Sequence, residues 1–331
     1  MQKSAMWCKM LVIVAGGCRP SLQSGEWSRT MQRLFLNLAA ILLACLAIPS
    51  LLSAEDAVDF ITRGNAWQEK GEYDKAIADY NQAIRLKPNN ADPYYFRGTV
   101  WEKKGEYDKA IADHNRAILL DPKHANAYNN RGAVWQKKGE YDKAITDCNQ
   151  ALALNPAFAT ALNNRGAAWY EKGEYDKAIT DCNEAIRLDP KDAKAHGTCG
   201  NAWNAKGDYG KAIDDFNQAV TLNPKLAAAY RDLAWLHATC PNEKYRDGKK
   251  AFENASKAYQ LSGGKEWSYL VTLAAAYAES GDFDKAKEWE AKAIELAATD
   301  KAVKAKDKAE ARSRLELYEQ GKPYREEPKK K

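Results

Sequence analysis

Cysteine and histidine are the residues of this sequence that could most directly bind a metal or act as nucleophiles. Four cysteines lie beyond residue 54, and none belongs to a C-x-x-C pair. No nucleophile elbow, phosphate-binding loop or HExxH motif occurs in the sequence. We therefore expect a protein that is not an enzyme, with no catalytic residue, no metal and no cofactor.

One eight-residue phrase, KGEYDKAI, sets the period of the chain. It begins at Lys70, Lys104, Lys138 and Lys172, and a variant, KGDYGKAI, begins at Lys206, so the spacing is always 34 residues. The glycine suits the left-handed end of one helix, and the acidic residues suit the start of the next. Ala-Ile then begins an apolar helix face. The phrase therefore predicts a stack of helix pairs joined by tight turns.

The repeats divide the chain into consecutive ranges. Residues 55–299 are predicted to hold seven helix pairs, of which the last two are irregular, with a longer loop around Pro241 in the sixth. A proline follows each of the first five second helices and ends it. Charged residues 300–321 predict a helix that caps the array, and residues 322–331 a disordered tail. The seven ranges are 57–90, 91–124, 125–158, 159–192, 193–226, 227–266 and 267–299.

These units resemble the tetratricopeptide repeat, and the ends of the array resemble those of exported bacterial members of that family. The resemblance rests on five positions of the 34-residue frame in the first five units and on the closing prolines. Position 4 is Phe60, Tyr94, Tyr128, Leu162 and His196. Position 8 is glycine (Gly64, Gly98, Gly132, Gly166, Gly200), position 11 is tryptophan (Trp67, Trp101, Trp135, Trp169, Trp203), and positions 20 and 27 are alanine. The resemblance implies an all-α, right-handed α-solenoid of antiparallel helix pairs, with first helices on the concave face and second helices on the convex face.

The resemblance also implies where a partner binds, because members of the family hold extended peptides on the concave face through positions such as 2, 5, 9, 12 and 13. An amide side chain both donates and accepts hydrogen bonds, so a row of asparagines could bind a peptide backbone of any sequence. The alternative is that these amides bond only water or one another. The candidate residues are Asn65, Tyr95, Asn129, Asn130, Gln136, Asn163, Asn164, Tyr170 and Asn201.

Arginine at position 7 and aspartate at position 23 also recur through the repeats. We interpret them as a structural ladder of charge-assisted hydrogen bonds, the alternative being arginines free to meet an acidic ligand. Cys199 replaces the arginine in the fifth unit, so Asp215 is expected to lack a partner. The tryptophan row is interpreted as core packing in preference to a sugar-binding stripe.

The four cysteines beyond residue 54 leave two interpretations open. They are Cys148, Cys182, Cys199 and Cys240. In an exported protein they could form two disulfides, although their spacing defines no pairing. We favour small buried thiols on helices, because Cys148 and Cys182 hold a core position where other units carry Tyr, His or Phe.

Residues 1–54 have the pattern of a leader. From Met31, which we take as the true start, a basic residue precedes an apolar stretch and a small-residue cleavage site. The alternative is that residues 1–30 extend the basic region of the leader. This predicts a signal peptide and export to the periplasm or the extracellular space. The alternatives are a membrane anchor through residues 34–52 and lipid attachment at Cys45 or Cys18.

Charge and repeats together indicate the class of function. The net charge is +5, but five basic residues and one acidic residue lie in the leader, so the remainder is nearly neutral and does not favour nucleic acid. We expect a non-catalytic scaffold that binds a peptide or a partner surface along the concave face. The alternative is a self-assembling structural element of the cell envelope, and a membrane enters only if the leader is retained or lipidated.

Overall fold

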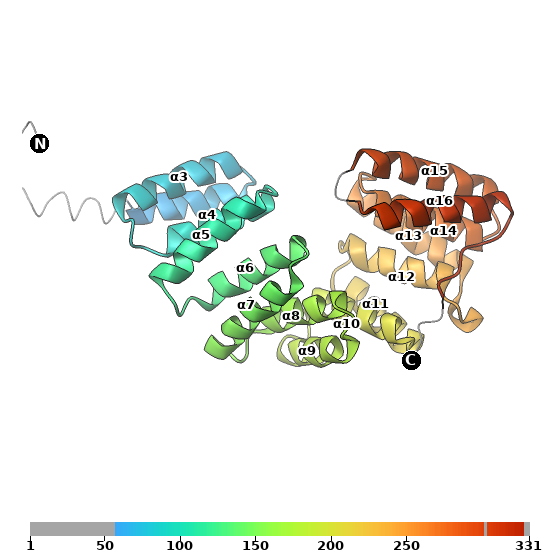
Figure 1. Cartoon of the computed structure of the whole chain (residues 1–331), viewed down its shortest axis with the longest axis horizontal. Helices are drawn as coiled ribbons and strands as arrows, with labels where there is room; N and C mark the ends of the chain where they lie inside the picture. The colour runs from blue at the N-terminus through green and yellow to red at the C-terminus, as the bar shows by residue number, and fades with distance from the viewer. Residues whose placement is uncertain (1–56, 301–302, 328–331) are drawn as a thin grey trace, which may run out of the picture. The chain divides into compact units, whose positions relative to one another are not determined.

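The computed structural model describes residues 57–300 and 303–327, and all regular elements in these ranges are helices (Figure 1). The all-α prediction is therefore confirmed. No helix in the described ranges is long and apolar enough to cross a membrane. The predicted leader, including its possible start, anchor and lipid-attachment cysteines, lies outside the described residues.

The chain divides into two compact units, one up to Pro88 and one from Asn89 onwards. The first contains a helix over residues 57–69 and helix α3 (Tyr73–Leu86). In the second, each first helix packs against the second helix that follows it. Its helices are α4 (Asp92–Lys103), α5 (Tyr107–Leu120), α6 (Ala125–Lys137), α7 (Tyr141–Leu154), α8 (Ala159–Glu171), α9 (Tyr175–Leu188), α10 (Ala193–Lys206), α11 (Tyr209–Leu222), α12 (Ala227–Thr239), the 3-10 helix η1 (Glu243–Tyr245), α13 (Gly248–Ser262), α14 (Trp267–Glu279), α15 (Phe283–Thr299) and α16 (Ala305–Glu319).

The glycine of the repeated phrase makes the turn within each helix pair. Gly139 has φ 77° and Gly173 has φ 80°, in the left-handed region that other residues rarely adopt. Tyr141 and Tyr175 then begin α7 and α9. These second helices end at Leu154 and Leu188, two residues before a proline. The turn predicted from the phrase and the helix ends predicted from the prolines are thus confirmed.

The glycine at position 8 lets the two helices of a pair approach closely. A Cβ on Gly200 would lie 2.6 Å from Cε1 of Phe216, and one on Gly98 would lie 2.8 Å from Cε1 of His114. Both rings are fully buried. A ring on one helix therefore fills the space that the missing side chain leaves on the other.

The charged residues of the phrase bind neighbouring elements. Lys172 forms an ion pair with Asp142 of the preceding repeat, and Lys138 and Lys206 form the equivalent pairs with Asp108 and Asp176. In each unit the later lysine of the phrase lies over the tryptophan at position 11, as Lys177 does at 4.5 Å from the ring centroid of Trp169. That tryptophan also packs against the buried cluster around Ile179. Core packing of the tryptophans is confirmed.

The predicted charge ladder is present, with one correction. Nε and Nη2 of Arg165 donate to the two carboxylate oxygens of Asp181, both at 2.7 Å. Asp215 does not lack a partner as expected, because Nδ1 of His196 lies 2.9 Å from its Oδ1. A histidine one helical turn before Cys199 therefore replaces the missing arginine. The other bidentate pairs are Arg63–Asp79, Arg97–Asp113 and Arg131–Asp147.

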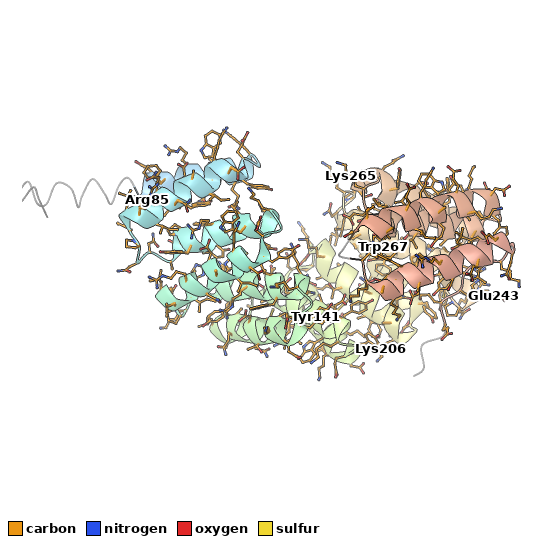
Figure 2. The ribbon with its side chains drawn as sticks, turned by 45° about the horizontal axis from the view of Figure 1, so that its top comes forward. Arg85, Tyr141, Lys206, Glu243, Lys265 and Trp267 are labelled. Atoms are coloured by element: carbon orange, nitrogen blue, oxygen red, sulfur yellow. A yellow bond between two sulfur atoms is a disulfide. The ribbon has the colours of Figure 1, made fainter. Side chains whose placement is uncertain are left out.

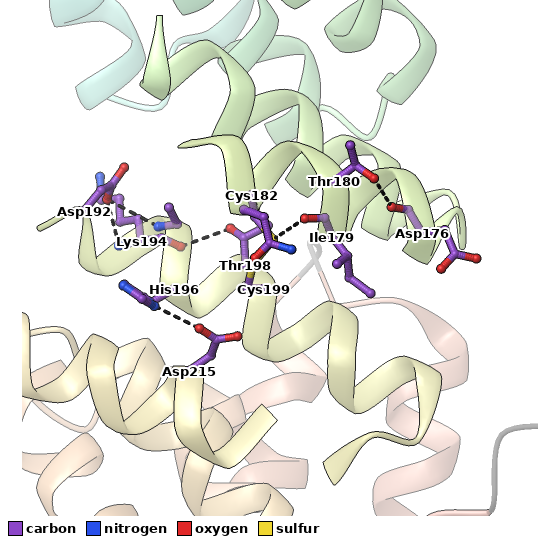
Figure 3. The surroundings of a disulfide bond; sticks show 12 residues. Asp176, Ile179, Thr180, Cys182, Asp192, Lys194, His196, Thr198, Cys199 and Asp215 are labelled. Carbon is purple, nitrogen blue, oxygen red and sulfur yellow. Dashed lines mark hydrogen bonds and ion pairs between the residues drawn. A yellow bond between two sulfur atoms is a disulfide. The ribbon is translucent and has the colours of Figure 1, made fainter. Parts of the chain in front are cut away.

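Two of the four cysteines form a disulfide (Figure 3). It joins Cys182 in α9 to Cys199 in α10, with a Cα–Cα distance of 5.6 Å. The interpretation as buried thiols is wrong for this pair and confirmed for Cys148 and Cys240, which are free and buried. The cross-link forms because Cys199 stands at the ladder position of α10, a helix that packs directly on α9.

The segment after α16 differs from the prediction of disorder from residue 322 onwards. Gly321, with φ 66°, turns the chain after α16, and residues 322–327 contact α12 and α14. Tyr324 packs on the cluster around Tyr318 and Ala278. The composition of this segment suggested disorder, but several of its side chains have defined partners on the repeats.

Candidate functional site

The first helices of consecutive repeats in the unit from Asn89 contact one another and form a continuous surface. We call it the first-helix face, made by α4, α6, α8, α10, α12 and α14. Most of the predicted site residues belong to these helices. Figure 2 shows the side chains, with Trp267 at the start of α14 on this face and Tyr141 at the start of α7, a second helix.

Amide and hydroxyl groups form a connected row across α4, α6 and α8. Asn130 donates through Nδ2 to the hydroxyl of Tyr95 at 3.2 Å and accepts at Oδ1 from Nδ2 of Asn129 at 3.1 Å. Asn129 in turn accepts at Oδ1 from Nδ2 of Asn164 at 2.9 Å. We call Tyr95, Asn129, Asn130 and Asn164 the amide row. Each repeat thereby fixes the side-chain orientation of the next.

The row stops at Asn163. Its side chain is 6% exposed, and its Oδ1 has no hydrogen-bond partner. By analogy with Asn130 and Asn164, the donor would come from position 6 of the next repeat, but Thr198 stands there and its hydroxyl donates to the carbonyl of Lys194. Beside it, Gly197 has open space where a side chain would begin. The acceptor of Asn163 is therefore buried without a partner, and no amide continues the row into α10.

The predicted residues divide by exposure. Asn129 and Asn163 are almost completely buried, whereas Asn130, Asn164 and Asn201 keep part of their surface. The buried amides therefore position the partly exposed ones, and direct contact with a partner falls to the latter. The alternative interpretation, in which the amides bond one another, therefore holds within the row. Asn130 and Asn164 nevertheless remain partly exposed.

The remaining predicted residues lie apart from the row. Nδ2 of Asn201 in α10 donates to Oδ2 of Asp232 in α12 at 3.3 Å. Tyr170 in α8 is half-buried, and burial raises the pKa of its hydroxyl, which therefore stays protonated at neutral pH. Gln136 is half-buried at the end of α6. Asn65 belongs to the unit ending at Pro88, where its Oδ1 accepts from the hydroxyl of Tyr80.

The arginine ladder does not supply free charges to this face. In the second unit, Arg97, Arg131 and Arg165 are each engaged by both oxygens of a buried aspartate. The hydrogen bonds that Arg165 donates to Asp181 raise the pKa of Arg165 above its usual range. The alternative of arginines waiting for an acidic ligand is therefore wrong for these three. Among the described residues, no cluster of His, Cys, Asp or Glu is placed to hold a metal ion.

The prediction missed a hollow of about 250 Å³ between α12, α14 and α16. Arg231 and Trp235 line it from α12, and Trp267 and Val271 line it from α14. Arg231 and Trp235 are positions 5 and 9 of the sixth unit when the 34-residue frame is carried past Leu226. The signal that could have identified them is their place in the frame, because positions 5 and 9 are candidate binding positions in the five regular units.

Family models identify the repeats. Those described as TPR repeat or tetratricopeptide repeat match residues 64–105, 102–139, 125–158, 159–192, 194–226 and 242–301. The chain belongs to the tetratricopeptide repeat family. Repeats of this family are generally non-catalytic modules of protein–protein interaction.

Solved structures share the fold. A tetratricopeptide repeat protein from Parabacteroides merdae is 19% identical over 80% of this chain and 99% of its own, with a TM-score of 0.59. PilF from Pseudomonas aeruginosa is 17% identical over 66% of this chain and 96% of its own, with a TM-score of 0.54. A chain of the APC/C hetero-tetramer Cut9-Hcn1 is 17% identical over 76% of this chain and 48% of its own, with a TM-score of 0.64. No curated protein matches the sequence significantly.

Proposed function

We propose that this protein is a non-catalytic scaffold that binds an extended peptide segment of a partner protein along the first-helix face. The observation that carries the proposal is the amide row, in which hydrogen bonds hold the partly exposed amides Asn130 and Asn164 on the first-helix face. The row thereby presents amide groups in fixed orientations. A peptide backbone offers the complementary donors and acceptors at every residue.

We also propose that the protein acts outside the cytoplasm, in the periplasm or the extracellular space. The signal-peptide pattern of the leader is one support. The disulfide between Cys182 and Cys199 is an independent one, because disulfides persist in oxidising compartments and are rare in the cytosol. Fractionation of cells that produce the tagged protein tests this proposal, and recovery of the uncut chain in the cytosol would contradict it.

Affinity capture from a cell-envelope extract tests the proposed function. The variant Asn130→Asp/Asn164→Asp changes two partly exposed amides into acceptors, and it should lose a partner that the unaltered protein retains. The matched control is Gln150→Glu, which makes a similar change on the exposed side of α7, a second helix. If both variants recover the same proteins as the parent, the first-helix face is not the binding surface. Recovery of only the protein itself, together with an oligomeric size in solution, would favour the self-assembling envelope element instead.

A further inference from the structure

Residues 322–327 bind to the repeats as an extended segment. After α16 the chain runs back past α14 and α12 (Figure 1). None of these residues is helical, and four of the six are partly buried against the repeats. We call the surface beneath them the tail site, formed by Trp235, Ala238 and Thr239 of α12 and Glu279 of α14.

The backbone of the segment is held by the end of α12. The last carbonyls of a helix have no partner within the helix, so they accept hydrogen bonds from outside it. The amide of Glu326 donates to the carbonyl of Thr239 at 2.9 Å, and Nη1 of Arg325 donates to the carbonyl of Ala238 at 3.1 Å. A backbone-to-backbone hydrogen bond of this kind accepts any residue and fixes the register of an extended chain.

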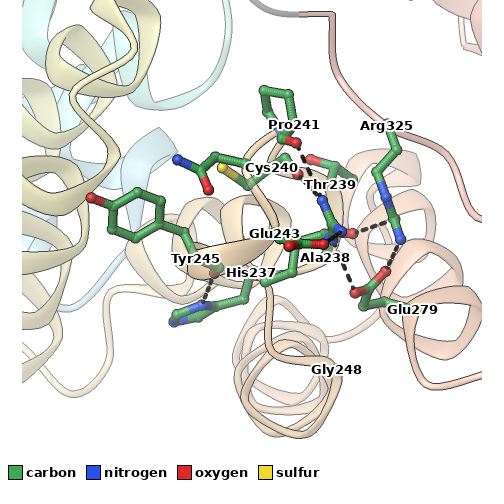
Figure 4. A network of polar contacts seen from close by, with 12 residues as sticks. His237, Ala238, Thr239, Cys240, Pro241, Glu243, Tyr245, Gly248, Glu279 and Arg325 are labelled. Carbon is green, nitrogen blue, oxygen red and sulfur yellow. Dashed lines mark hydrogen bonds and ion pairs between the residues drawn. The ribbon is translucent and has the colours of Figure 1, made fainter.

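Three successive side chains of the segment each meet a different chemical group. The ring of Tyr324 lies 5.9 Å from that of Trp235. Arg325 forms an ion pair with Glu279 at 2.5 Å, as Figure 4 shows. Glu326 accepts from the indole N–H of Trp235 at 2.8 Å. The tail site thus provides an aromatic surface, a carboxylate and a neutral hydrogen-bond donor. These groups suit an aromatic, a cationic and an anionic residue, in that order along the segment.

The tail site lies on the first-helix face. Trp235, Ala238 and Thr239 are positions 9, 12 and 13 of the sixth unit, and Glu279 is position 13 of the seventh. The hollow lined by Arg231 and Trp235 adjoins it. The chain's own segment therefore occupies part of the surface to which the proposed function assigns an external peptide.

We propose that the tail site recognises an extended partner segment with the chemistry Tyr-Arg-Glu, and that residues 322–327 occupy it in cis until such a segment displaces them. This inference rests on the proposed function and adds the chemistry of the partner and a built-in competitor. The contacts favour exchange, because they are mostly polar and Tyr324, Arg325 and Glu326 all remain partly exposed. Glu279 also keeps a second cation nearby, since Nε of Arg246 lies 3.4 Å from its Oε1, so its charge stays balanced when the segment leaves.

The size of the competition follows from the tether. A segment joined by a short linker acts at an effective concentration on the order of 1 mM. If the segment binds with a dissociation constant of about 0.1 mM, the site is free for roughly a tenth of the time, and an external peptide binds about ten-fold more weakly than to an empty site.

A labelled peptide of sequence KPYREEPKKK, which copies residues 322–331, tests the inference by fluorescence anisotropy. The full chain with Arg325→Glu places a carboxylate opposite Glu279 and should release the segment while leaving the site intact. We expect the peptide to bind this variant at least ten-fold more tightly than the parent. A control peptide with the arginine changed to glutamate should lose that gain.

Equal binding of the peptide to parent and variant, or equal binding of both peptides, would overturn the inference and leave the segment as a structural cap. A measurement on the parent protein alone covers the case in which Arg325→Glu does not fold. Excess peptide should speed hydrogen exchange of residues 322–327, and unchanged exchange would count against displacement. A parent dimer that Arg325→Glu abolishes would assign the site to the segment of a second copy and would also overturn the inference.

The two proposals can fail separately. Asn130→Asp/Asn164→Asp changes α6 and α8 and does not touch the tail site, so peptide binding by Arg325→Glu should persist when these changes are added. A partner lost with the amide variant, combined with no peptide binding by Arg325→Glu, would retain the proposed function and reject only the tail site. The reverse pattern would retain the tail site and reject the amide row.

Discussion

At the scale of single residues, position 24 of the frame accepts side chains of different chemistry. It is the core position on each second helix. Tyr80, His114 and Phe216 each fill the space beside the glycine at position 8, while Cys148 and Cys182 fill it less completely. His114 is the unfavourable member of the set, because neither ring nitrogen has a hydrogen-bond partner. Burial of these unpaired nitrogens therefore lowers the stability of the folded protein, which burial of an apolar ring would not do.

His114→Phe should stabilise the protein, and more so in acid. Burial lowers the pKa of His114 to about 3, so the unfolded chain takes up a proton below its ordinary pKa of about 6.5 and the folded chain does not. The stability of the parent should thus fall as the pH drops from 6.5, by about 3 kcal/mol at pH 4.5 from this residue alone. Urea unfolding at several pH values measures the difference between variant and parent.

The reverse change, Phe216→His, is the matched control because Phe216 fills the same place in the fifth unit. It should lower stability and introduce the acid sensitivity that His114→Phe removes. A difference between His114→Phe and the parent that is the same at pH 7 and pH 4.5 would show that His114 is protonated in the folded protein.

Arg131→Met should destabilise the protein because it leaves Asp147, which is 4% exposed, without its two charged donors. Removal of one partner from a largely buried pair costs about 3 kcal/mol. Arg187→Met is the control, since Arg187 and Glu184 form an exposed pair within one helix, and its loss should change the free energy of unfolding far less. Equal free energies of unfolding for the two variants would mean that the ladder does not support the fold.

At the scale of elements, the packing of α16 on α14 and α15 encloses a buried hydrogen-bonded pair, Arg314 and Glu290. Nε of Arg314 donates to Oε1 of Glu290 at 2.9 Å, while Oε2 of Glu290 and the hydroxyl of Tyr318 have no partner. The polar face predicted for a capping helix is thus incomplete, because one of its arginines points into the core. The pair ties the last helix to the seventh unit through one specific contact.

Glu290→Gln should make the capping region less sensitive to pH. Burial raises the pKa of Glu290 to about 7 against the opposing effect of Arg314, so the folded protein holds a proton that the unfolded chain has released. For a carboxyl group with a raised pKa, the stability is highest below pH 4.5 and is lost as the pH rises through 7. The loss for this shift is about 3 kcal/mol.

The measurement is the free energy of unfolding of Glu290→Gln minus that of the parent, which should increase between pH 5 and pH 7.5. Glu295→Gln, which changes an exposed carboxylate of the same helix, should give a difference that stays constant over this range. A constant difference for Glu290→Gln as well would show that the carboxylate is ionised in the folded protein at pH 5.

At the scale of the whole molecule, the helix pairs, their glycine turns and the arginine ladder could all be predicted, because each depends on residues at fixed places in a repeated frame. The features that were missed depend on residues that occur once. His196 reaches Asp215 only because Cys199 has replaced an arginine, and Cys199 meets Cys182 only across the junction of two repeats. Neither contact recurs along the chain, so the repeat pattern does not predict it.

The candidate site follows the same rule. The asparagines were identified from the frame, but their mutual hydrogen bonds and the burial of Asn129 and Asn163 depend on how neighbouring helices pack. The segment 322–327 was misjudged because its charged composition is typical of disorder. Its partners, Trp235 and Glu279, lie far away in the sequence, in the irregular units.

Loss of the disulfide should lower the stability of the folded protein by about 3 kcal/mol, the value expected for a loop of roughly this length, 17 residues. Urea unfolding of the oxidised and the fully reduced protein measures this difference. Cys148→Ala should retain it, because that change removes a free thiol and no cross-link. The stability of Cys182→Ala/Cys199→Ala should be the same with and without reductant. An equal stability of the oxidised and the reduced parent would show that the cross-link does not support the fold.

The ion pairs that join successive copies of the phrase have a consequence for how such a chain can evolve. Lys138, Lys172 and Lys206 meet the same aspartate of the preceding phrase, so the third and fourth units present the same edges to their neighbours. Unequal crossing-over between their coding sequences would insert or delete one whole unit without creating a new junction. If one partner binds both the amide row and the tail site, the number of units between them sets the spacing of the two motifs that this partner must carry.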